Sequence, residues 1–289
     1  MTLEQLRIFV AVAEREHMTA AARAVNVTQS AASAAIAALE ARHGVRLFDR
    51  VGRGITLTDT GRMFLEEARA VLARAAAAEQ ALNDLGGLLR GSLHLVASQT
   101  TAAYWLPPIL ATFRARYPLV VIDLTIGNTE QAAARVRDGE AELGIVEGGV
   151  DDPALGLWPI AQDQLILVKA ASTAPLADAD ALRAARWVMR EAGSGTRSVL
   201  DESLRRLGID PALLEVAMVL PSNESVRTAV EHGAGIAALS ALVVAPAIAA
   251  GRLQALPIDL GRRPFYGLRH KARYRSRAVQ ALLDLIGEL

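Results

Sequence analysis

The first apolar residues of the chain recur at intervals of three and four, which predicts an amphipathic helix near the N-terminus. This stripe consists of Leu3, Leu6, Phe9, Val10 and Ala13. A longer stripe begins after residue 60 and keeps the four-three alternation of a heptad repeat. Its members are Phe64, Ala68, Val71, Ala75, Ala78, Leu82, Leu85 and Leu89. The segment between the stripes is rich in Ala, and the chain beyond them alternates between strand and helix patterns.

The Ala-rich segment predicts two short helices, over residues 19–25 and 29–43, that meet at a sharp turn. Asn26 tolerates the left-handed backbone of such a turn, and Thr28 can cap the second helix through its hydroxyl oxygen. Small side chains would let the two backbones approach, namely Ala21, Ala22, Ala31 and Ala32. This pattern is typical of a helix-turn-helix, whose second helix presents its first residues to base edges. The candidate DNA-binding residues on it are Thr28, Gln29, Ser30 and Ser33. Two packed helices of an ordinary helical core would give the same local pattern.

Two short extended runs, RLFDR and GITLT, follow the helix pair and predict a β-hairpin. Gly52 and Gly54 flank Arg53, so this arginine would lie at the tip of a tight turn. A hairpin beside a helix-turn-helix is a wing, and Arg50 and Arg53 are candidates for contacts with phosphate or the minor groove. A solvated surface turn is the alternative.

A long helix, capped by Thr58 or Asp59, is predicted from about Gly61 to Leu89. The seam from Phe64 to Leu89 would be roughly 39 Å long. One apolar seam of that length needs a partner, and an identical chain is the simplest one. A dimer would place two recognition helices on one face of the DNA, so the target should be an inverted repeat. The alternative is a long helix that packs on the globular part of its own chain.

Strands separated by helices occupy the chain after Gly91, which predicts an α/β fold with parallel sheets. The predicted strands are residues 92–97, 120–126, 142–146, 164–170, 187–190, 215–220 and 235–240, with a last one through Tyr266. The predicted helices are residues 102–117 (interrupted around Pro107 and Pro108), 130–138, 196–207, 224–232, 241–250 and 276–289. We expect a DNA-binding domain over residues 1–60, a linker helix over 61–90 and an effector-binding domain over 91–289. The last would form two subdomains with a cleft between them, one of residues 91–161 and 267–289 and one of 162–266.

Polar residues follow several predicted strands, at the edge where ligands bind in open α/β sheets. The sequence AGSGTR, residues 192–197, is the most informative of these junctions. Its glycines let backbone N–H groups converge at a helix start, where the dipole favours an anion, and Arg197 adds a positive charge. The candidate effector-binding residues are Ser98, Thr100, Thr101, Asn128, Thr129, Glu147, Ser194, Gly195, Thr196, Arg197 and Asn223. Each junction alone is compatible with ordinary helix capping, but together they predict a cleft for a small anion.

Composition excludes several classes of function. The chain contains no Cys, so thiolate metal sites, thiolate nucleophiles and disulfides are absent. The N-terminus has no signal-peptide pattern and no segment is apolar enough to span a membrane, so we expect a cytoplasmic protein. The net charge is zero, with 31 basic and 31 acidic residues, although Arg42, Arg46, Arg50 and Arg53 cluster beside the recognition helix.

Three other features attract attention without predicting chemistry. The five His residues have no metal-ligand spacing. The segment containing Arg197 lacks the Lys and the spacing of a P-loop, so nucleotide hydrolysis has no support. The basic run RRPFYGLRHKARYRSR, residues 262–277, resembles a nucleic-acid patch, but its position before the last helix favours a solvated turn.

These segments together resemble the LysR-type transcriptional regulators. The resemblance rests on LEQLRIFVAVAE, on TAAARAVNVTQSAASAAIAALEARHGVRLFDR, on the Arg53, Leu57, Thr58 and Gly61 pattern of the wing, and on GSGTR and SNE in the effector domain. The last two are similar to the branch that includes regulators of carbon fixation and sulfur metabolism.

The resemblance implies a winged helix-turn-helix, a dimerising linker helix and a periplasmic-binding-protein-like effector domain. It also implies a homodimer or homotetramer on promoter DNA, a small-molecule effector without a cofactor or metal, and RNA polymerase as a partner. The chain departs from the family at Ala34 and Ala35, where Arg and Gln are frequent, and at His17 and Met18.

An enzyme or small-molecule-binding protein with an N-terminal oligomerisation segment is the alternative. No nucleophile and base are paired near the polar junctions, so the sequence favours a regulator that is not an enzyme.

Overall fold

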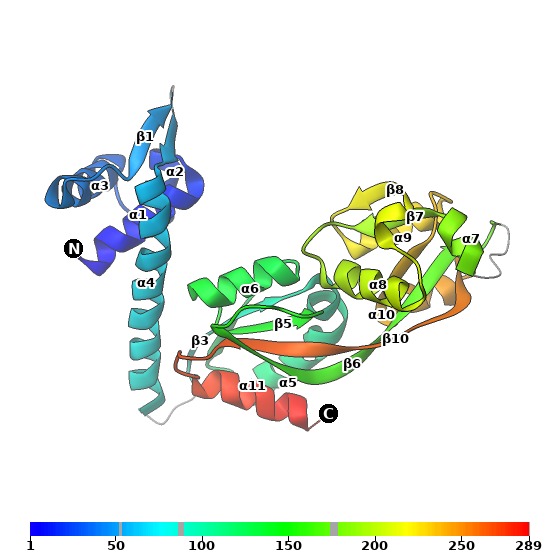
Figure 1. The fold of residues 1–289 in the computed structure, drawn as a ribbon. Helices are drawn as coiled ribbons and strands as arrows, with labels where there is room; N and C mark the ends of the chain where they lie inside the picture. The colour runs from blue at the N-terminus through cyan, green and yellow to red at the C-terminus, as the bar shows by residue number, and fades with distance from the viewer. Residues whose placement is uncertain (52–53, 86–89, 174–178, 289) are drawn as a thin grey trace. The chain divides into compact units, whose positions relative to one another are not determined.

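A computed structural model describes residues 1–51, 54–85, 90–173 and 179–288 of the 289-residue chain. The chain divides into two compact units (Figure 1). The first comprises Met1–Gly86 with Asp138–Glu140, and the second comprises Gly87–Arg137 with Ala141–Leu289. Each unit has its own buried core, so each is described separately.

Three helices form the core of the first unit: α1 (Leu3–Arg15), α2 (Met18–Ala24) and α3 (Gln29–His43). The buried side chains of this core are Leu6, Ile8, Phe9, Ala11, Val12, Ala21, Ala22, Ala32, Ile36, Leu39, Leu47 and Ala68. Leu3 and Ala31 are exposed, contrary to the predicted packing. The buried face of α1 is shifted toward Ile8, Ala11 and Val12, which leaves Leu3 at the edge of the first turn.

The turn of the helix pair has the predicted geometry. Asn26 has a φ of 56°, in the left-handed region. The hydroxyl oxygen of Thr28 accepts a hydrogen bond from the Ala31 N–H (3.2 Å), and α3 spans the predicted residues. Helix α2 begins at Met18 rather than Thr19, because Nδ1 of His17 caps it by accepting from the Ala20 N–H (3.2 Å).

A two-stranded antiparallel hairpin of β1 (Phe48–Val51) and β2 (Gly54–Leu57) follows α3, as predicted. Arg53 lies outside the described residues. Gly61, just beyond the hairpin, packs against the Leu47 carbonyl oxygen, which a Cβ atom at residue 61 would approach to 2.1 Å. A glycine is therefore required where the hairpin meets the following helix.

Helix α4 (Asp59–Leu85) begins with the Thr58 hydroxyl oxygen accepting from the Gly61 N–H (2.9 Å). It starts two residues earlier than predicted, and Leu89 of the predicted seam lies outside the described residues. Ala68 is buried in the core of the first unit, whereas Val71 and Leu82 are 41% and 71% exposed. Val71 and Leu82 of the seam are thus not covered by the core of the first unit.

The second unit contains a six-stranded sheet in the order β4-β3-β5-β10-β6-β9 and a two-stranded sheet of β7 and β8. The strands are β3 (Gly91–Ala97), β4 (Val120–Ile126), β5 (Leu143–Glu147), β6 (Leu155–Ala170), β7 (Arg186–Arg190), β8 (Glu215–Leu220), β9 (Ala237–Ser240) and β10 (Leu253–His270). The predicted parallel pairing occurs between β3 and β4, β3 and β5, and β7 and β8. Strand β10 pairs antiparallel with β5 and β6, and β6 pairs antiparallel with β9.

Two long strands, β6 and β10, connect the two subdomains of this unit (Figure 1). Trp158 and Ile160 of β6 pack on the core that contains β3 and α11, whereas Leu165 and Leu167 pack on the core that contains β7 and α8. The first half of β6 was not predicted, because its Gly, Trp and Pro residues do not form an apolar run. We call the parts of the unit that are built on these two cores its two subdomains, and the boundary between them the cleft.

The helices of the second unit are α5 (Leu106–Arg116), α6 (Thr129–Asp138), α7 (Ala179–Ala184), α8 (Gly195–Arg206), α9 (Asn223–Glu231), α10 (Ala241–Ala249) and α11 (Arg277–Gly287), with a 3-10 turn η2 (Pro211–Leu213). A π-helical turn, η1 (Thr101–Trp105), leads into α5. The predicted interruption at Pro107 is this change of helix type, since proline is tolerated in the first turn of a helix. None of the helices in the described ranges is long and apolar enough to cross a membrane.

Candidate functional site

The start of α3 presents a small polar surface in the first unit. Thr28, Gln29 and Ser30 are exposed, and Ser33 is half-buried. Nε2 of Gln29 donates to Oγ of Ser33 (3.2 Å), and the hydroxyls of Thr28 and Ser30 lie 3.0 Å apart. These contacts orient the Gln29 amide, whose donor and acceptor can together read an adenine edge.

Basic side chains accompany this surface. Arg42, Arg46 and Arg50 are all exposed, and Arg50 lies on β1 opposite Ile55 of β2. Guanidinium groups on a wing contact phosphates and position the reading helix on the duplex. The geometry of these residues suits a nucleic-acid interface, while Arg53 cannot be placed.

The candidate effector residues lie where the two subdomains of the second unit meet. At one end of this cleft, Thr100 precedes η1 and Asn223 begins α9, and Nδ2 of Asn223 donates to the Thr100 hydroxyl (3.0 Å). The side chain of Gln99 donates to the Pro221 carbonyl (2.7 Å) and accepts from the Asn223 N–H (3.0 Å). The two subdomains are thus hydrogen-bonded to one another here.

A third contact strengthens this end of the cleft. The hydroxyl of Tyr104 donates to Oε1 of Glu224 (2.9 Å). Burial raises the pKa of Tyr104, and the hydrogen bond and negative charge of Glu224 raise it further. The phenol therefore stays protonated at neutral pH and remains a donor. We call the contacts of Gln99, Thr100 and Tyr104 with residues 221–224 the cleft latch.

The starts of α6 and α8 meet at the other end of the cleft. The hydroxyl of Thr129 donates to the Glu147 carbonyl (2.6 Å), and the Glu130 N–H donates to the Gly193 carbonyl (3.2 Å). A Cβ atom at Gly195 would lie 1.9 Å from the same Glu147 carbonyl oxygen. This contact explains the glycine in the GSGTR segment, because a side chain would separate the two elements.

The other candidates take supporting contacts. Ser98 and Thr101 lie 3.0 Å apart through their hydroxyl groups, and Thr101 donates to the Ile145 carbonyl (2.9 Å). The Ser194 hydroxyl caps α8 by accepting from the Arg197 N–H (3.4 Å). Most of the predicted effector residues thus contact one another or the backbone of β5, and these contacts are structural.

Sequence reasoning missed two charged residues between these ends, Arg190 and Glu191. The Arg190 side chain donates to Oδ1 of Asn223 (2.6 Å) and makes two hydrogen bonds to the Glu191 carboxylate (2.8 and 2.9 Å). Nδ2 of Asn128 donates to the same carboxylate (3.4 Å). The sequence signal that could have identified Arg190 was its charge at the end of the otherwise apolar predicted strand 187–190.

Sequence reasoning also missed Arg263, which was assigned to a solvated basic turn. This assignment is wrong for residues 262–270, which form the end of β10, and Arg263 is only 2% exposed. Its Nε donates to Oδ2 of Asp163 on β6 (2.8 Å), and its Nη1 donates to the Thr196 hydroxyl (2.9 Å). Ser240 donates to the other oxygen of Asp163 (2.8 Å). A buried, charged network therefore links β6 and β10 to the start of α8.

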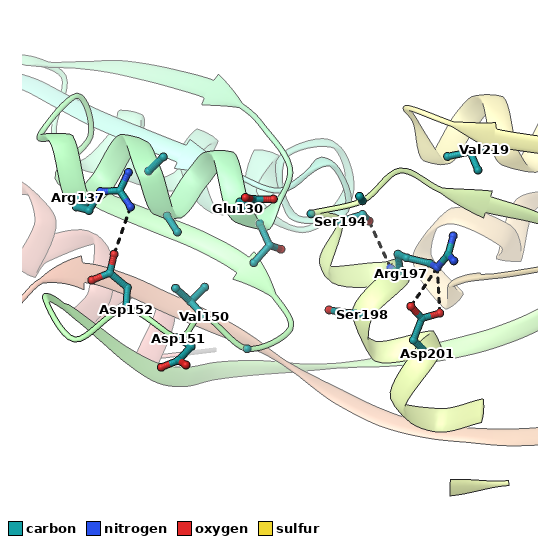
Figure 2. A pocket seen from close by; sticks show the side chains of 16 residues that line it. Glu130, Arg137, Val150, Asp151, Asp152, Ser194, Arg197, Ser198, Asp201 and Val219 are labelled. Atoms are coloured by element: carbon teal, nitrogen blue, oxygen red, sulfur yellow. Dashed lines mark hydrogen bonds and ion pairs between the residues drawn. The ribbon is translucent and has the colours of Figure 1, made fainter. Parts of the chain in front are cut away.

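Arg197, predicted to supply the positive charge of the cleft, is paired with an acid. Its Nε donates to both carboxylate oxygens of Asp201 (3.0 and 3.2 Å), and its Nη1 donates to the Arg190 carbonyl (3.4 Å). Figure 2 shows this pair on one wall of a cavity and the Arg137–Asp152 ion pair on the opposite wall. Both arginines are thus already partnered.

That cavity has a volume of about 780 Å³ and lies between α6 and α8. Its wall includes the predicted residues Thr129, Ser194 and Arg197. Its charged residues are Glu130, Arg137, Asp151, Asp152, Arg197 and Asp201. The four acidic side chains of the cavity wall outnumber its two arginines, so the wall as a whole does not attract an anion.

The described residues offer no metal centre, since no group of three or more His, Asp or Glu side chains could hold an ion. The cleft is built from hydroxyl, amide and paired charged groups and from helix starts. Such an arrangement can bind and orient a small polar molecule.

Comparison with known proteins gives two family matches that together cover most of the chain. Residues 3–62 match the bacterial regulatory helix-turn-helix protein, lysR family, and residues 86–289 match the LysR substrate binding domain.

Individual relatives match along almost their whole length. The chain is 36% identical to the HTH-type transcriptional regulator YeiE of Escherichia coli K12, covering 98% of this chain and 96% of YeiE. It is 32% identical to a probable RuBisCO transcriptional regulator of Cyanophora paradoxa, covering 99% and 91%.

Two solved structures share the fold. Full-length CbnR complexed with its target DNA superposes with a TM-score of 0.70 at 23% identity, covering 100% of this chain and 99% of CbnR. The Synechocystis PCC6803 CcmR regulatory domain in complex with 2-PG gives a TM-score of 0.62 at 27% identity, covering 69% and 97%.

Proposed function

Because the chain belongs to the LysR family of transcriptional regulators, we propose that it binds an inverted-repeat promoter site as a homodimer or homotetramer. We further propose that a small anionic metabolite in the cleft of the second unit controls it, without a cofactor. The same role makes RNA polymerase a partner and the cytoplasm the location. Members of this family are regulators, so the alternative of an enzyme is not favoured.

The convergence of helix starts at the cleft is the observation that carries the anion proposal. Helices α6 and α8 begin on either side of the Glu147 carbonyl, and α9 begins at Asn223, beside Arg190. Helix N-termini carry partial positive charge and free N–H donors, so together they favour a negative ligand. The 2-PG complex of the CcmR domain supports a small ligand in a related effector domain.

The uncovered seam of α4 supports the proposed oligomer. Val71 and Leu82 expose apolar surface at heptad positions, and a second copy of the helix would cover them. Two copies related by a twofold axis present two α3 helices, which matches an inverted repeat.

A gel shift with promoter DNA tests the DNA-binding part. Gln29→Ala and Arg50→Ala should each weaken binding, because one removes a base contact and the other a phosphate contact. Gln254→Ala, at an exposed position on β10, is the matched control and should bind as the wild type does. Unchanged binding by both test variants, with the oligomer intact, would remove the proposal.

A thermal-shift screen of sulfate, sulfite, phosphorylated sugars and small carboxylates tests the effector part. We expect at least one anion to stabilise the second unit and expect Thr129→Val to reduce that stabilisation, since it alters the start of α6. If only neutral or cationic compounds stabilise the protein, the effector is not an anion.

A further inference from the structure

Arg190, Arg197 and Arg263 each contact a candidate effector residue or belong to that set, and they differ in how their nitrogens are used. The three guanidinium nitrogens of Arg190 bond Glu191 and Asn223. Arg197 is engaged with Asp201 and with a backbone carbonyl. Arg263 uses Nε and Nη1, but its buried Nη2 has no hydrogen-bond partner among the described residues. A buried donor without a partner is costly, so a function should account for it.

The Glu147 carboxylate forms an ion pair with this nitrogen. Oε1 of Glu147 lies 3.6 Å from Nη2 of Arg263, beyond hydrogen-bond distance. Glu147 is 2% exposed, and its backbone carbonyl is the point where α6 and α8 meet. The Glu147 side chain therefore lies beside Arg263 without a hydrogen bond to its Nη2.

The position of Arg263 combines several sources of positive potential. Its Nη1 donates to Thr196 in the first turn of α8, a helix of 12 residues whose dipole favours an anion at that end. Asp163 neutralises one side of the guanidinium, which leaves the Nη2 side for another acceptor. A guanidinium and a helix start thus act on the same point.

We propose that Arg263 binds the effector anion directly through Nη2, and that the Glu147 carboxylate holds this place when no ligand is bound. This inference rests on the proposed function. The ligand class is a compound with a compact, oxygen-bearing anionic group, a sulfate, phosphate or carboxylate, that accepts from Arg263 and from the N–H groups at the start of α8. Such a group displaces the Glu147 side chain.

The location of Arg263 connects this exchange to the boundary between the subdomains. Arg263 lies on β10 and Asp163 on β6, the two strands that join the subdomains. Thr196 belongs to one subdomain and Glu147 to the other. Replacing the Glu147 contact with a ligand contact changes which groups hold the subdomains together at this boundary, so the ligand favours one arrangement over another.

Isothermal titration of full-length protein with sulfate and with inorganic phosphate tests the inference. Arg263→Lys keeps a positive charge beside Asp163 but removes the second guanidinium nitrogen. We expect it to weaken anion binding about 10- to 100-fold, the effect of one charge-assisted hydrogen bond. The neighbouring Arg262→Lys is the matched control, because Arg262 is exposed, and it should leave affinity unchanged.

Glu147→Gln should have the opposite effect on anion affinity. Removing the competing carboxylate should tighten anion binding several-fold, which a purely structural role of this network would not produce. The triple variant Glu147→Gln, Asp163→Asn and Arg263→Gln removes the charges without leaving a buried acid unpaired, and it should lose anion binding while retaining its fold by circular dichroism.

The outcomes separate the two proposals. If wild-type protein binds anions and Arg263→Lys binds them equally well, the inference about Arg263 is overturned and the anionic effector stands. If Arg197→Ala abolishes binding and Arg263→Lys does not, Arg197 is the anion-binding residue. If no anion binds the wild type, both the inference and the anionic effector fail.

Discussion

At the scale of single residues, the cleft depends on the lack of a side chain at Gly195 as much as on its hydroxyl groups. Gly195 lets the start of α8 lie against the Glu147 carbonyl, and the Thr129 hydroxyl bonds that same carbonyl. Any side chain at position 195 must push α8 away from β5. The polar groups of the cleft would then lose the alignment that makes their N–H donors converge.

Gly195→Ala should therefore destabilise the protein by roughly 1–3 kcal/mol, as overpacking does in tight interiors. Urea unfolding of the variant gives the value. Gly149→Ala is the control, because nothing lies within 4 Å of a Cβ built at that exposed glycine. Equal stability of the two variants would show that α8 and β5 separate without cost.

Local chemistry made some residues predictable and left others hidden. The conformation of Asn26 and the capping role of Thr28 follow from properties of those side chains alone. The contacts of Arg190 and Arg263 depend on segments far apart in the chain, and Arg263 looked like part of an exposed basic run. No local pattern distinguishes a buried, paired arginine from a solvated one.

At the scale of elements, the cleft latch joins the start of η1 and the two residues before it, in one subdomain, to the start of α9 in the other. Gln99 makes hydrogen bonds in both directions across this boundary, and Tyr104 adds its bond to Glu224. These contacts are few and partly exposed, so the latch can open without unfolding either subdomain. We propose that ligand binding shifts the population of closed and open cleft at this boundary.

Gln99→Ala should increase the open population, because it removes two hydrogen bonds that exist only when the subdomains are closed. Hydrogen exchange at residues 221–226 should become faster, while exchange in the core strand β3 stays unchanged. Thr112→Ala, an exposed site on α5 whose hydroxyl bonds its own helix, is the control. Unaltered exchange at the start of α9 would mean that the latch does not hold the cleft.

The latch also predicts a pH dependence. The pKa of Tyr104 is raised above its ordinary value of 10.0 in the folded protein, chiefly by burial. The folded state thus holds this proton more tightly, and the related stabilisation is present below pH 10 and is lost as the pH rises through the folded pKa. Thermal melts of Tyr104→Phe should fall less steeply above pH 10 than those of wild type. Parallel curves would contradict the assignment.

Element boundaries were more predictable where the pattern was local. Strand β8 has the predicted bounds, as does α3, since each is a regular run between clear turn residues. The first half of β6 was missed, and β10 is much longer than a strand inferred from its apolar centre. Both strands cross from one core to another, so the two halves of each strand pack in different surroundings. No single periodicity of apolar residues therefore describes a whole strand.

At the scale of the whole molecule, the proposed regulation requires two DNA-reading units whose separation can change. Only part of the apolar seam of α4 is buried within its own unit. Ala68 packs in the core of that unit, whereas Val71 and Leu82 remain exposed. A partner helix accounts for the exposed part. Under the proposed function, the effector domain acts on DNA through this assembly rather than through a single chain.

Leu82→Glu should dissociate the assembly, because it places a charge in the seam without touching the core of either unit. We expect weaker binding to a full inverted repeat but little change for an isolated half-site, measured by gel shift. Met63→Glu is the control, since Met63 is 74% exposed and lies outside the seam. An inverted-repeat affinity equal to that of wild type would remove α4 from the interface.

Sedimentation of the wild-type protein with its operator tests the central claim most directly. Analytical ultracentrifugation at the concentrations that saturate the operator should show two or four chains on each DNA. A single chain that sediments alone and still binds the operator with full affinity would contradict the account, because DNA binding would then not require a second recognition helix.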